Sequence, residues 1–350
     1  MKLENYPDKT YFSPNILATK LEAVEKNYFD DEFMKYFCSR SHGSTLGSLF
    51  NTLKVLSIRW IIERFLTYFE GETVQFVNLG CGLDTLSLWL LSKYSIVVCF
   101  DLDLDHEIQK KIHILTHTNE LLTLFPEYKV DSSSFSSKHF HALGCDLREV
   151  RNLERLLSHG FSYDLPTVFL SEFALTYLEN HLSNEVIKWF GVKMRKSSLF
   201  IYSEHTRPNS CFIKWLYSNY FTGRSRVYSP FQYPTPQSQV QRFKELGWDD
   251  SFICDLTFVY NHMFNPQQKQ QLTELGDLGD KELLSLTLST CVIGTAHRHC
   301  DPSLVSSISE LYTPKSDSEE NLLPVFTEYL EQEHNLNPLL EPFNRFFHLS

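Results

Sequence analysis

The stretch FVNLGCGLDTLSLWL, residues 76–90, joins one apolar run to another through two glycines. The run TVQFVNL (73–79) is rich in β-branched and apolar residues and predicts a strand, and LDTLSLWLLS (83–92) has the apolar spacing of a helix. Glycines between a strand and a helix allow the backbone to approach a ligand closely. The sheet and a candidate binding loop are therefore predicted to begin here.

Further strands are predicted to follow, mostly in alternation with helices. They are SIVVCFDLD (95–103), FHALGCDL (140–147), LPTVFLSEF (165–173), SSLFIYSEH (197–205), FICDLTFVY (252–260) and STCVIGTA (289–296). Continuous apolar runs such as TVFL are typical of strands buried on both faces. We therefore predict an α/β fold with a mainly parallel seven-stranded sheet and helices on both faces.

The chain divides into three predicted regions. Residues 1–70 have a mostly helical pattern and no strand partner, so we expect a helical cap or lid over the carboxyl edge of the sheet. Residues 71–300 form the core, with a proline-rich, substrate-side insertion around 205–245. Residues 301–350 form a C-terminal extension that we expect to be partly flexible, because it carries the charge run SDSEE.

Composition excludes several classes of protein. The 350 residues include 32 Lys and Arg against 43 Asp and Glu, and the net charge of −11 disfavours a nucleic-acid or membrane partner. The N-terminus lacks the apolar region of a secretory signal, and the eight cysteines form no CxxC pair. We expect a reduced, monomeric, cytoplasmic protein. His297-Arg298-His299-Cys300 lacks a second ligand cluster, so we predict a surface turn and no metal.

Polar residues stand at the ends of four predicted strands. They are Gly80, Gly82 and Asp84 after the first strand, Asp101 and Asp103 at the second, Asp146 at the third and Glu172 at the fourth. The carboxyl ends of parallel strands share one edge, where ligands bind in open α/β sheets.

Each of these residues also has a structural alternative. The glycines can form a tight turn, Asp84 can be a first-turn acid, and Asp146 can cap the helix REVRNLERLL, with Glu149 completing a capping box. Glu172 is the hardest to explain this way, because an unpaired charge at the end of a buried strand is costly.

The glycine loop does not suit a phosphate ligand. In a GxGxxG fingerprint the third glycine would replace Thr85, and Asp84 would repel phosphate from the helix N-terminus. S-adenosylmethionine fits better because it has no phosphate. Its ribose diol can pair with a carboxylate that ends the second strand, and its amino and sulfonium groups favour acidic surroundings.

At these residues the sequence resembles a known family. VNLGCGLDT, FDLD, LGCDLREVRNLERLL, LPTVFLSEFALTYL and CDLTFVYN are similar, in order, to blocks of the leucine carboxyl methyltransferases. That family methylates the C-terminal leucine carboxylate of the protein phosphatase 2A catalytic subunit. The resemblance implies a class I methyltransferase fold, S-adenosylmethionine as the methyl donor and the phosphatase tail as the partner.

The resemblance also implies roles for individual residues. It places the cofactor against the backbone of Gly80, its ribose at Asp103, its adenine at Asp146 and Leu147, and its methionine moiety at Glu172. Tyr177 matches a position that faces the transferred methyl group and the substrate, and Lys20 matches a basic position near the incoming carboxylate. An ionised carboxylate needs no general base, so positioning would carry the catalysis.

One departure from the family concerns the cofactor carboxylate. The family has an arginine in a GYxARV-like helix, whereas this chain has GSLFNTLKV and places Lys54 there, with Arg59 as the other candidate. Lysine keeps the charge but lacks the two-pronged geometry of arginine. This substitution motivates an alternative function as a divergent, non-catalytic cofactor-binding paralogue.

Two further hypotheses concern the substrate. Arg224 and Arg226, in the aromatic-rich segment 215–233, are candidates for gripping an acidic peptide or the phosphatase surface. The second alternative function is the related tRNA wybutosine-type carboxyl methyltransferase, which the net charge of −11 disfavours.

Overall fold

The computed structural model describes residues 13–39, 45–210, 213–214, 226–274 and 281–314. Within these residues a nine-stranded sheet has the order β3-β4-β5-β2-β1-β6-β7-β9-β8. The strands are β1 Val74–Leu79, β2 Val97–Asp103, β3 Lys129–Val130, β4 Ser134–Ser136, β5 Phe140–Gly144, β6 Thr167–Glu172, β7 Ser198–His205, β8 Asp250–Asp255 and β9 Cys291–Arg298.

The centre of the sheet is parallel, and its two sides are antiparallel. Neighbouring strands from β5 through β2, β1 and β6 to β7 are parallel, β9 runs antiparallel between β7 and β8, and the β3–β4 hairpin extends the other edge. All seven predicted strands are present, and the short strands β3 and β4 add to them. The predicted α/β fold with a mainly parallel sheet is therefore confirmed.

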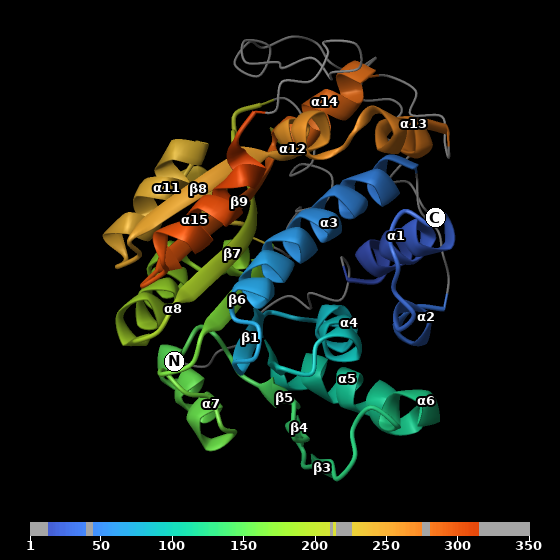
Figure 1. Ribbon diagram of the computed structural model, residues 1–350, viewed down its shortest axis with the longest axis vertical. Helices are drawn as coiled ribbons and strands as arrows, with labels where there is room; N and C mark the ends of the chain where they lie inside the picture. The colour runs from blue at the N-terminus through green and yellow to red at the C-terminus, as the bar shows by residue number, and fades with distance from the viewer. Residues whose placement is uncertain (1–12, 40–44, 211–212, 215–225, 275–280, 315–350) are drawn as a thin grey trace.

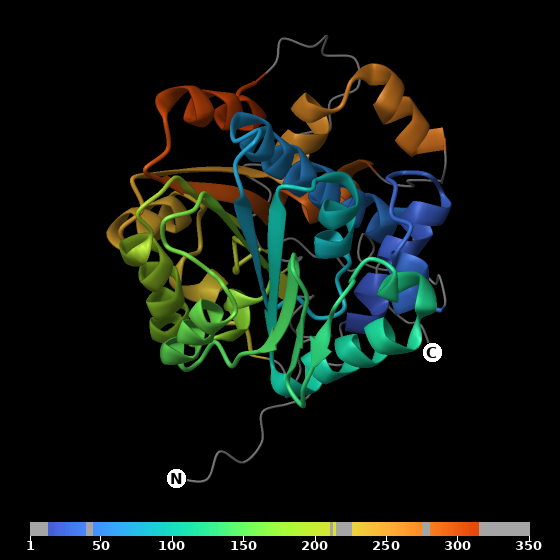
Figure 2. The ribbon, with the colours of Figure 1, turned by 60° about the horizontal axis from the view of Figure 1, so that its bottom comes forward.

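Helices cover both faces of this sheet. Figure 2 shows α7 and α8 on one side of the strands and α3, α4 and α5 on the other. The helices are α1 Ser13–Glu25, α2 Met34–Phe37, α3 Thr45–Tyr68, α4 Leu86–Lys93, α5 Asp105–His117, α6 Asn119–Leu122, α7 Arg155–Ser158, α8 Asn180–Lys193, α10 Ser229–Gln232, α11 Pro236–Glu245, α12 Leu256–Met263, α13 Pro266–Glu274, α14 Lys281–Ser289 and α15 Pro302–Ser309. The 3₁₀ helices of the described residues are η2 Val150–Glu154, η3 Leu175–Tyr177 and η4 Glu310–Tyr312.

Alternate residues of each central strand enter different cores. In β1, Phe76 packs in the core that also holds residues of α3 and α4, whereas Val77 packs in the core that holds residues of α7 and α8. Successive side chains of a strand point to opposite faces, so a strand covered on both sides must be apolar throughout. This is the physical reason why continuous apolar runs identified the strands.

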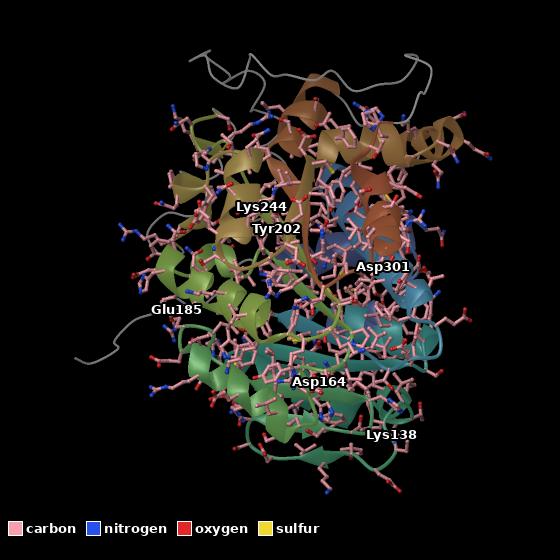
Figure 3. The ribbon with its side chains drawn as sticks, turned by 60° about the vertical axis from the view of Figure 1, so that its left-hand side comes forward. Lys138, Asp164, Glu185, Tyr202, Lys244 and Asp301 are labelled. Atoms are coloured by element: carbon pink, nitrogen blue, oxygen red, sulfur yellow. The ribbon has the colours of Figure 1, made fainter. Side chains whose placement is uncertain are left out.

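The side of the sheet under α11 contains a closely packed aromatic cluster. Tyr202 of β7 is fully buried there (Figure 3), with its ring 4.3 Å from that of Phe243 and its hydroxyl 3.2 Å from Ser251 Oγ. Gly294 lies opposite Tyr202 in β9, and a Cβ at that position would come within 2.1 Å of the tyrosine ring. Only glycine therefore lets the Tyr202 ring lie across β9.

The N-terminal helices pack beside the sheet (Figure 1). The 24-residue helix α3 contacts α1, α12 and α15, and α1 in turn contacts α2. Helices are thus found where the sequence predicts them before the first strand. In the described part of the chain, no helix has the length and apolar character needed to cross a bilayer.

The predicted strand over residues 252–260 is wrong in its second half. Strand β8 ends at Asp255, where the Asp255 carboxylate accepts a hydrogen bond of 2.8 Å from the backbone N–H of Phe258. This side-chain cap starts helix α12, in which five of the residues expected in a strand lie. Apolar content alone did not separate the strand from the capped helix.

The capping box proposed at Asp146 and Glu149 is also absent. The Asp146 carboxylate accepts a hydrogen bond from the backbone N–H of Arg148 and is held by that residue's guanidinium, while Glu149 pairs with Arg151. The helix that follows begins as the 3₁₀ helix η2 at Val150, without a side-chain cap. The nearby arginines thus take the carboxylates that the capping box would have used.

The predicted surface turn at residues 297–300 begins two residues later than expected. His297 and Arg298 are the last residues of β9, and His299, with φ of 54°, makes the turn. The His299 N–H donates to Asp249, which ties this turn to the approach to β8.

Candidate functional site

A cleft lies at the carboxyl ends of β1, β2 and β6, under helix α1. The cleft is partly open to solvent and has a volume of about 150 Å³. The residues that line it are Ile16, Leu17 and Lys20 of α1, Asn78, Gly80, Cys81, Gly82, Leu83 and Asp84 from the end of β1 onward, Asp103 and Glu107, and Glu172, Phe173, Ala174 and Tyr177.

The glycine loop is pressed against the loop that follows β6. Gly80 has a φ of 71°, and a Cβ at this position would lie only 2.4 Å from the Cβ of Ala174. Gly82 also has a positive φ, of 49°, and its N–H donates to Asp103 Oδ2 over 2.7 Å. The two glycines therefore allow a loop conformation that brings the carboxyl ends of β1, β2 and β6 together.

Asp103 is fixed in the cleft by backbone donors. Its Oδ1 accepts from the Leu104 N–H over 2.7 Å, while its Oδ2 accepts from Gly82. A carboxylate oxygen can accept more than one hydrogen bond, so both oxygens keep capacity for hydroxyl groups of a ligand. This arrangement suits the diol-binding role implied for Asp103.

Asp101, two residues earlier on the same strand, does not reach the cleft. Its side chain is completely buried, and its carboxylate accepts from the ammonium of Lys111 and the hydroxyl of Ser87. Although Asp101 and Asp103 share a face of the strand, helices α4 and α5 cover the earlier position. The expectation that both aspartates border one crevice is therefore wrong for Asp101.

Glu172 joins a buried network of two carboxylates and two lysines. Lys20 Nζ lies 2.9 Å from Asp84 Oδ2 and 3.1 Å from Glu172 Oε2, and Lys54 Nζ lies 2.8 Å from Glu172 Oε1. The lysine side chains are 4% and 2% exposed, and those of the carboxylates 17% and 14%. The charge at the end of β6 is therefore balanced by residues from α1 and α3.

Three members of the network, Lys20, Asp84 and Glu172, are kept ionised by their neighbours. Burial would raise the pKa of Asp84, but the neighbouring Lys20 lowers it to about 2. Burial likewise opposes ionisation of Glu172, yet Lys20 and Lys54 bring its pKa below the usual value. For Lys20, burial is outweighed by Asp84 and Glu172, which raise its pKa. All three groups therefore carry charge at neutral pH.

The structure distinguishes Lys54 from Arg59. Lys54 lies between the rings of Phe50 and Phe173, 5.1 and 5.0 Å from their centroids, and points to Glu172. Arg59 instead donates to the carbonyl oxygen of Asp30 over 2.6 Å and stacks 3.9 Å from the ring of Trp89. Lys54 is therefore the residue placed near the cleft, and Arg59 ties the segment before α2 to α3 and α4.

Four of the predicted site residues are not among those that line this cleft, and one of them is Lys54, which contacts the lining residue Glu172. Asp146 is held by the guanidinium of Arg148, and Leu147 packs in the core beneath α7 and α8. Arg224 lies outside the described residues, and the neighbouring Arg226 is exposed. The roles implied for these residues stay predictions.

Tyr177 borders the cleft at the end of η3. Burial, and then the charge of Glu204, raise the pKa of its hydroxyl, so it is neutral at physiological pH. Phe173, between Glu172 and η3, has a φ of 52°, a conformation that residues other than glycine rarely adopt. This turn directs the Phe173 ring toward Lys54 and allows η3 to bring Tyr177 to the cleft.

Glu204 is a buried acid that the sequence reasoning missed. It is 3% exposed at the end of β7, faces the hydroxyls of Thr176 and Ser229, and has Arg242 behind it. The rule that singled out Glu172, a polar residue at the end of an apolar strand, applies equally to SSLFIYSEH and would have found it. Glu204 thus lies beneath the segment that carries Tyr177.

We expect Glu204 to make stability depend on pH. Burial raises its pKa from 4.5 to about 7, although Arg242 opposes this shift. The folded state thus binds more protons than the unfolded chain between about pH 4.5 and 7, so the free energy of unfolding should fall by up to about 3 kcal/mol as pH rises through that window. Urea unfolding at pH 5 and 7.5 measures this loss.

Glu204→Gln should flatten this dependence, because glutamine does not titrate. Glu185→Gln, at an exposed position of α8, is the matched control and should leave the wild-type slope unchanged. Equal slopes for the wild type and Glu204→Gln would show that Glu204 is ionised throughout.

Side chains of the kinds that bind metal ions also occur among the described residues. In the ranges that the structure describes, no group of three or more His, Cys, Asp or Glu side chains is arranged to hold a metal ion.

Comparisons with known proteins match this chain to one family. The family model for leucine carboxyl methyltransferase matches residues 15–191. Leucine carboxyl methyltransferase 1 of Caenorhabditis elegans is 27% identical, covering 78% of this chain and 86% of its own, and that of Yarrowia lipolytica is 25% identical, covering 79% and 93%.

Two other matches cover a smaller share of the matched protein. tRNA wybutosine-synthesizing protein 4 of Schizosaccharomyces pombe is 25% identical, covering 62% of this chain and 33% of its own. A solved Haemonchus contortus methyltransferase structure with S-adenosylhomocysteine covers 85% of this chain and 60% of its own, with 9% identity and a TM-score of 0.44.

Proposed function

Because this chain belongs to the leucine carboxyl methyltransferase family, we propose that it transfers a methyl group from S-adenosylmethionine to the C-terminal leucine α-carboxylate of the protein phosphatase 2A catalytic subunit, giving a methyl ester. The observation that carries the proposal is the cleft in which Lys20, Asp103, Glu172 and Tyr177 meet. The length of the match to the proteins named leucine carboxyl methyltransferase 1 supports this choice of acceptor.

The chemistry of the cleft suits this cofactor. A methionine moiety carries an ammonium and a carboxylate, and the network offers both a carboxylate, Glu172, and lysines next to it. Asp103 has acceptor capacity for a ribose diol. Asp84, at the start of α4, favours a cationic ligand over a phosphate.

In the proposed mechanism the protein orients two reactants. Bound S-adenosylmethionine supplies a methyl group on a sulfonium; the acceptor oxygen forms the new C–O bond as the C–S bond breaks, and no proton moves. Asp103 and Glu172 would hold the ribose and amino groups, with Lys54 toward the carboxylate. Lys20 and Tyr177 would position the acceptor, and apolar side chains such as Leu17 would exclude water.

The proposed activity predicts a specific product. Incubating the protein with S-adenosylmethionine carrying a radiolabelled methyl group and with the phosphatase catalytic subunit should give a base-labile ester on the phosphatase. A phosphatase variant lacking its terminal leucine should accept no label. Absence of transfer to the intact subunit would contradict the proposal.

Two alternatives are outcomes of the same assay. Label transferred to tRNA carrying the wybutosine precursor, and not to the phosphatase, would favour the wybutosine-type activity, which the similarity to the Schizosaccharomyces pombe protein motivates. Binding of S-adenosylmethionine in calorimetry, without transfer to either acceptor, would favour a non-catalytic paralogue in which Lys54 has replaced the arginine.

A further inference from the structure

The network at Glu172 is asymmetric. Lys54 is enclosed by two aromatic rings and contacts Glu172 Oε1, whereas Lys20 lines the cleft and is shared between Glu172 Oε2 and Asp84. Asp84 is itself anchored, since its other oxygen accepts from the Leu86 N–H over 2.9 Å. Both carboxylate partners of Lys20 line the cleft, but Asp84 is held by a backbone donor, whereas Glu172 is shared with a second lysine.

The charges of this network are balanced as the structure shows it. Two lysines match two carboxylates, so this end of the cleft carries no net charge. A cationic group that enters the cleft and pairs with Glu172 shares this carboxylate with Lys20 and Lys54, and so weakens the hold of Oε2 on Lys20. The Lys20 ammonium has three N–H donors, and those released from Glu172 can then bind another anion.

We propose that Lys20 is an exchangeable counter-ion that couples cofactor binding to acceptor binding. The cofactor ammonium takes the place of Lys20 at Glu172, while Asp84 keeps Lys20 at the cleft, and the Lys20 ammonium then pairs with the acceptor carboxylate. This proposal rests on the proposed function, because it requires an acceptor that carries a carboxylate. It adds that the acceptor site is completed only after the cofactor has bound.

The charge balance also predicts which form of the cofactor favours binding of the acceptor. The methionine end of the cofactor is zwitterionic and adds no net charge, but the sulfonium adds one positive charge, which an acceptor carboxylate neutralises. Transfer of the methyl group removes both charges, because a thioether and an ester are neutral. The coupling should therefore be strong before methyl transfer and weaker after it, which favours release of the products.

The coupling can be measured by calorimetry of the full chain. The probes are sinefungin, an unreactive analogue with an amine in place of the sulfonium, and a peptide of the phosphatase tail ending in a free leucine carboxylate. Sinefungin should tighten peptide binding by about tenfold or more, and S-adenosylhomocysteine by less. The same peptide with an amidated C-terminus should show no such gain. Equal peptide affinity with and without sinefungin overturns the proposal.

Two variants should differ in their effect on sinefungin affinity. Lys20→Met removes the competitor for Glu172, so sinefungin should bind as tightly as to the wild type or several-fold more tightly, while the coupling to the peptide is lost. Asp84→Asn leaves Lys20 with Glu172 as its carboxylate partner, so sinefungin should bind more weakly. Weakening by both variants would mean that Lys20 only supports the fold, and would overturn the proposal.

Controls separate this result from misfolding and from failure of the proposed function. Lys20→Met with Asp84→Asn removes both charges, avoids a buried unpaired carboxylate, and should keep sinefungin binding without coupling. Lys26→Met, which removes an ion pair to Glu22 beside the same helix, should match the wild type. If no peptide binds under any condition, the proposed acceptor is wrong, whereas the two single variants still test exchange at Glu172.

Discussion

Replacing Glu172 with alanine is expected to lower the affinity for S-adenosylmethionine by about 30-fold or more. Loss of one partner of a buried, hydrogen-bonded charge pair costs about 2–5 kcal/mol of binding free energy, and 1.4 kcal/mol corresponds to a factor of ten. The same change removes the shared counter-charge of Lys20 and Lys54, so the melting temperature should fall as well. Calorimetric titration with S-adenosylmethionine, together with thermal unfolding, measures both effects.

Two control variants show whether the Glu172 charge is responsible. Glu172→Gln keeps the size of the side chain, so it should lose most of the affinity with a smaller fall in melting temperature. Glu185→Ala, at the exposed surface of α8 (Figure 3), should change neither quantity. Wild-type affinity in Glu172→Ala would show that the strand-end assignment of the cofactor is misplaced.

Replacing Asp101 with alanine is expected to give a large loss of stability without acting on the cleft. Asp101 and Lys111 are both completely buried, and they pair with each other. Removing the carboxylate leaves the Lys111 ammonium buried without its counter-charge, which typically costs about 3–5 kcal/mol. Urea unfolding at neutral pH, compared with the wild type, measures the loss.

The double variant Asp101→Asn with Lys111→Met is the matched control. Removing both charges of a buried pair is often close to neutral, so this variant should recover most of the stability. It should also bind S-adenosylmethionine normally, because neither residue lines the cleft. A loss below about 1 kcal/mol in Asp101→Ala would mean that water reaches Lys111 after the substitution.

The main strands were predictable because burial on both faces forces apolar side chains at successive positions. The β3–β4 hairpin was not, because β3 contains two exposed residues, Lys129 and Val130, and burial places no demand on them. The strand prediction for the second half of the segment 252–260 is wrong for a different reason. Its apolar residues satisfy a helix as well as a strand, and the hydrogen bond from Phe258 to Asp255 decides in favour of the helix.

The sequence predicted the site only at residues whose position follows from the order of the strands. Gly80, Asp103 and Glu172 follow or end strands of one parallel sheet, so strand order brings them to one edge. The balance of Glu172 by Lys20 and Lys54 could not be read this way, because the lysines come from helices remote in sequence. The separation of Asp101 from Asp103 depends likewise on where α4 and α5 pack.

The position of β9 has a consequence for synthesis on the ribosome. Strand β9 is the last of the described strands along the chain but lies between β7 and β8, so β8 has no sheet neighbour among them until β9 has been made. Until then the edge of β7 keeps unpaired backbone groups, and such an edge can pair with strands of other chains. Nascent protein that stalls before Cys291 is therefore expected to be aggregation-prone although its parallel strands are complete.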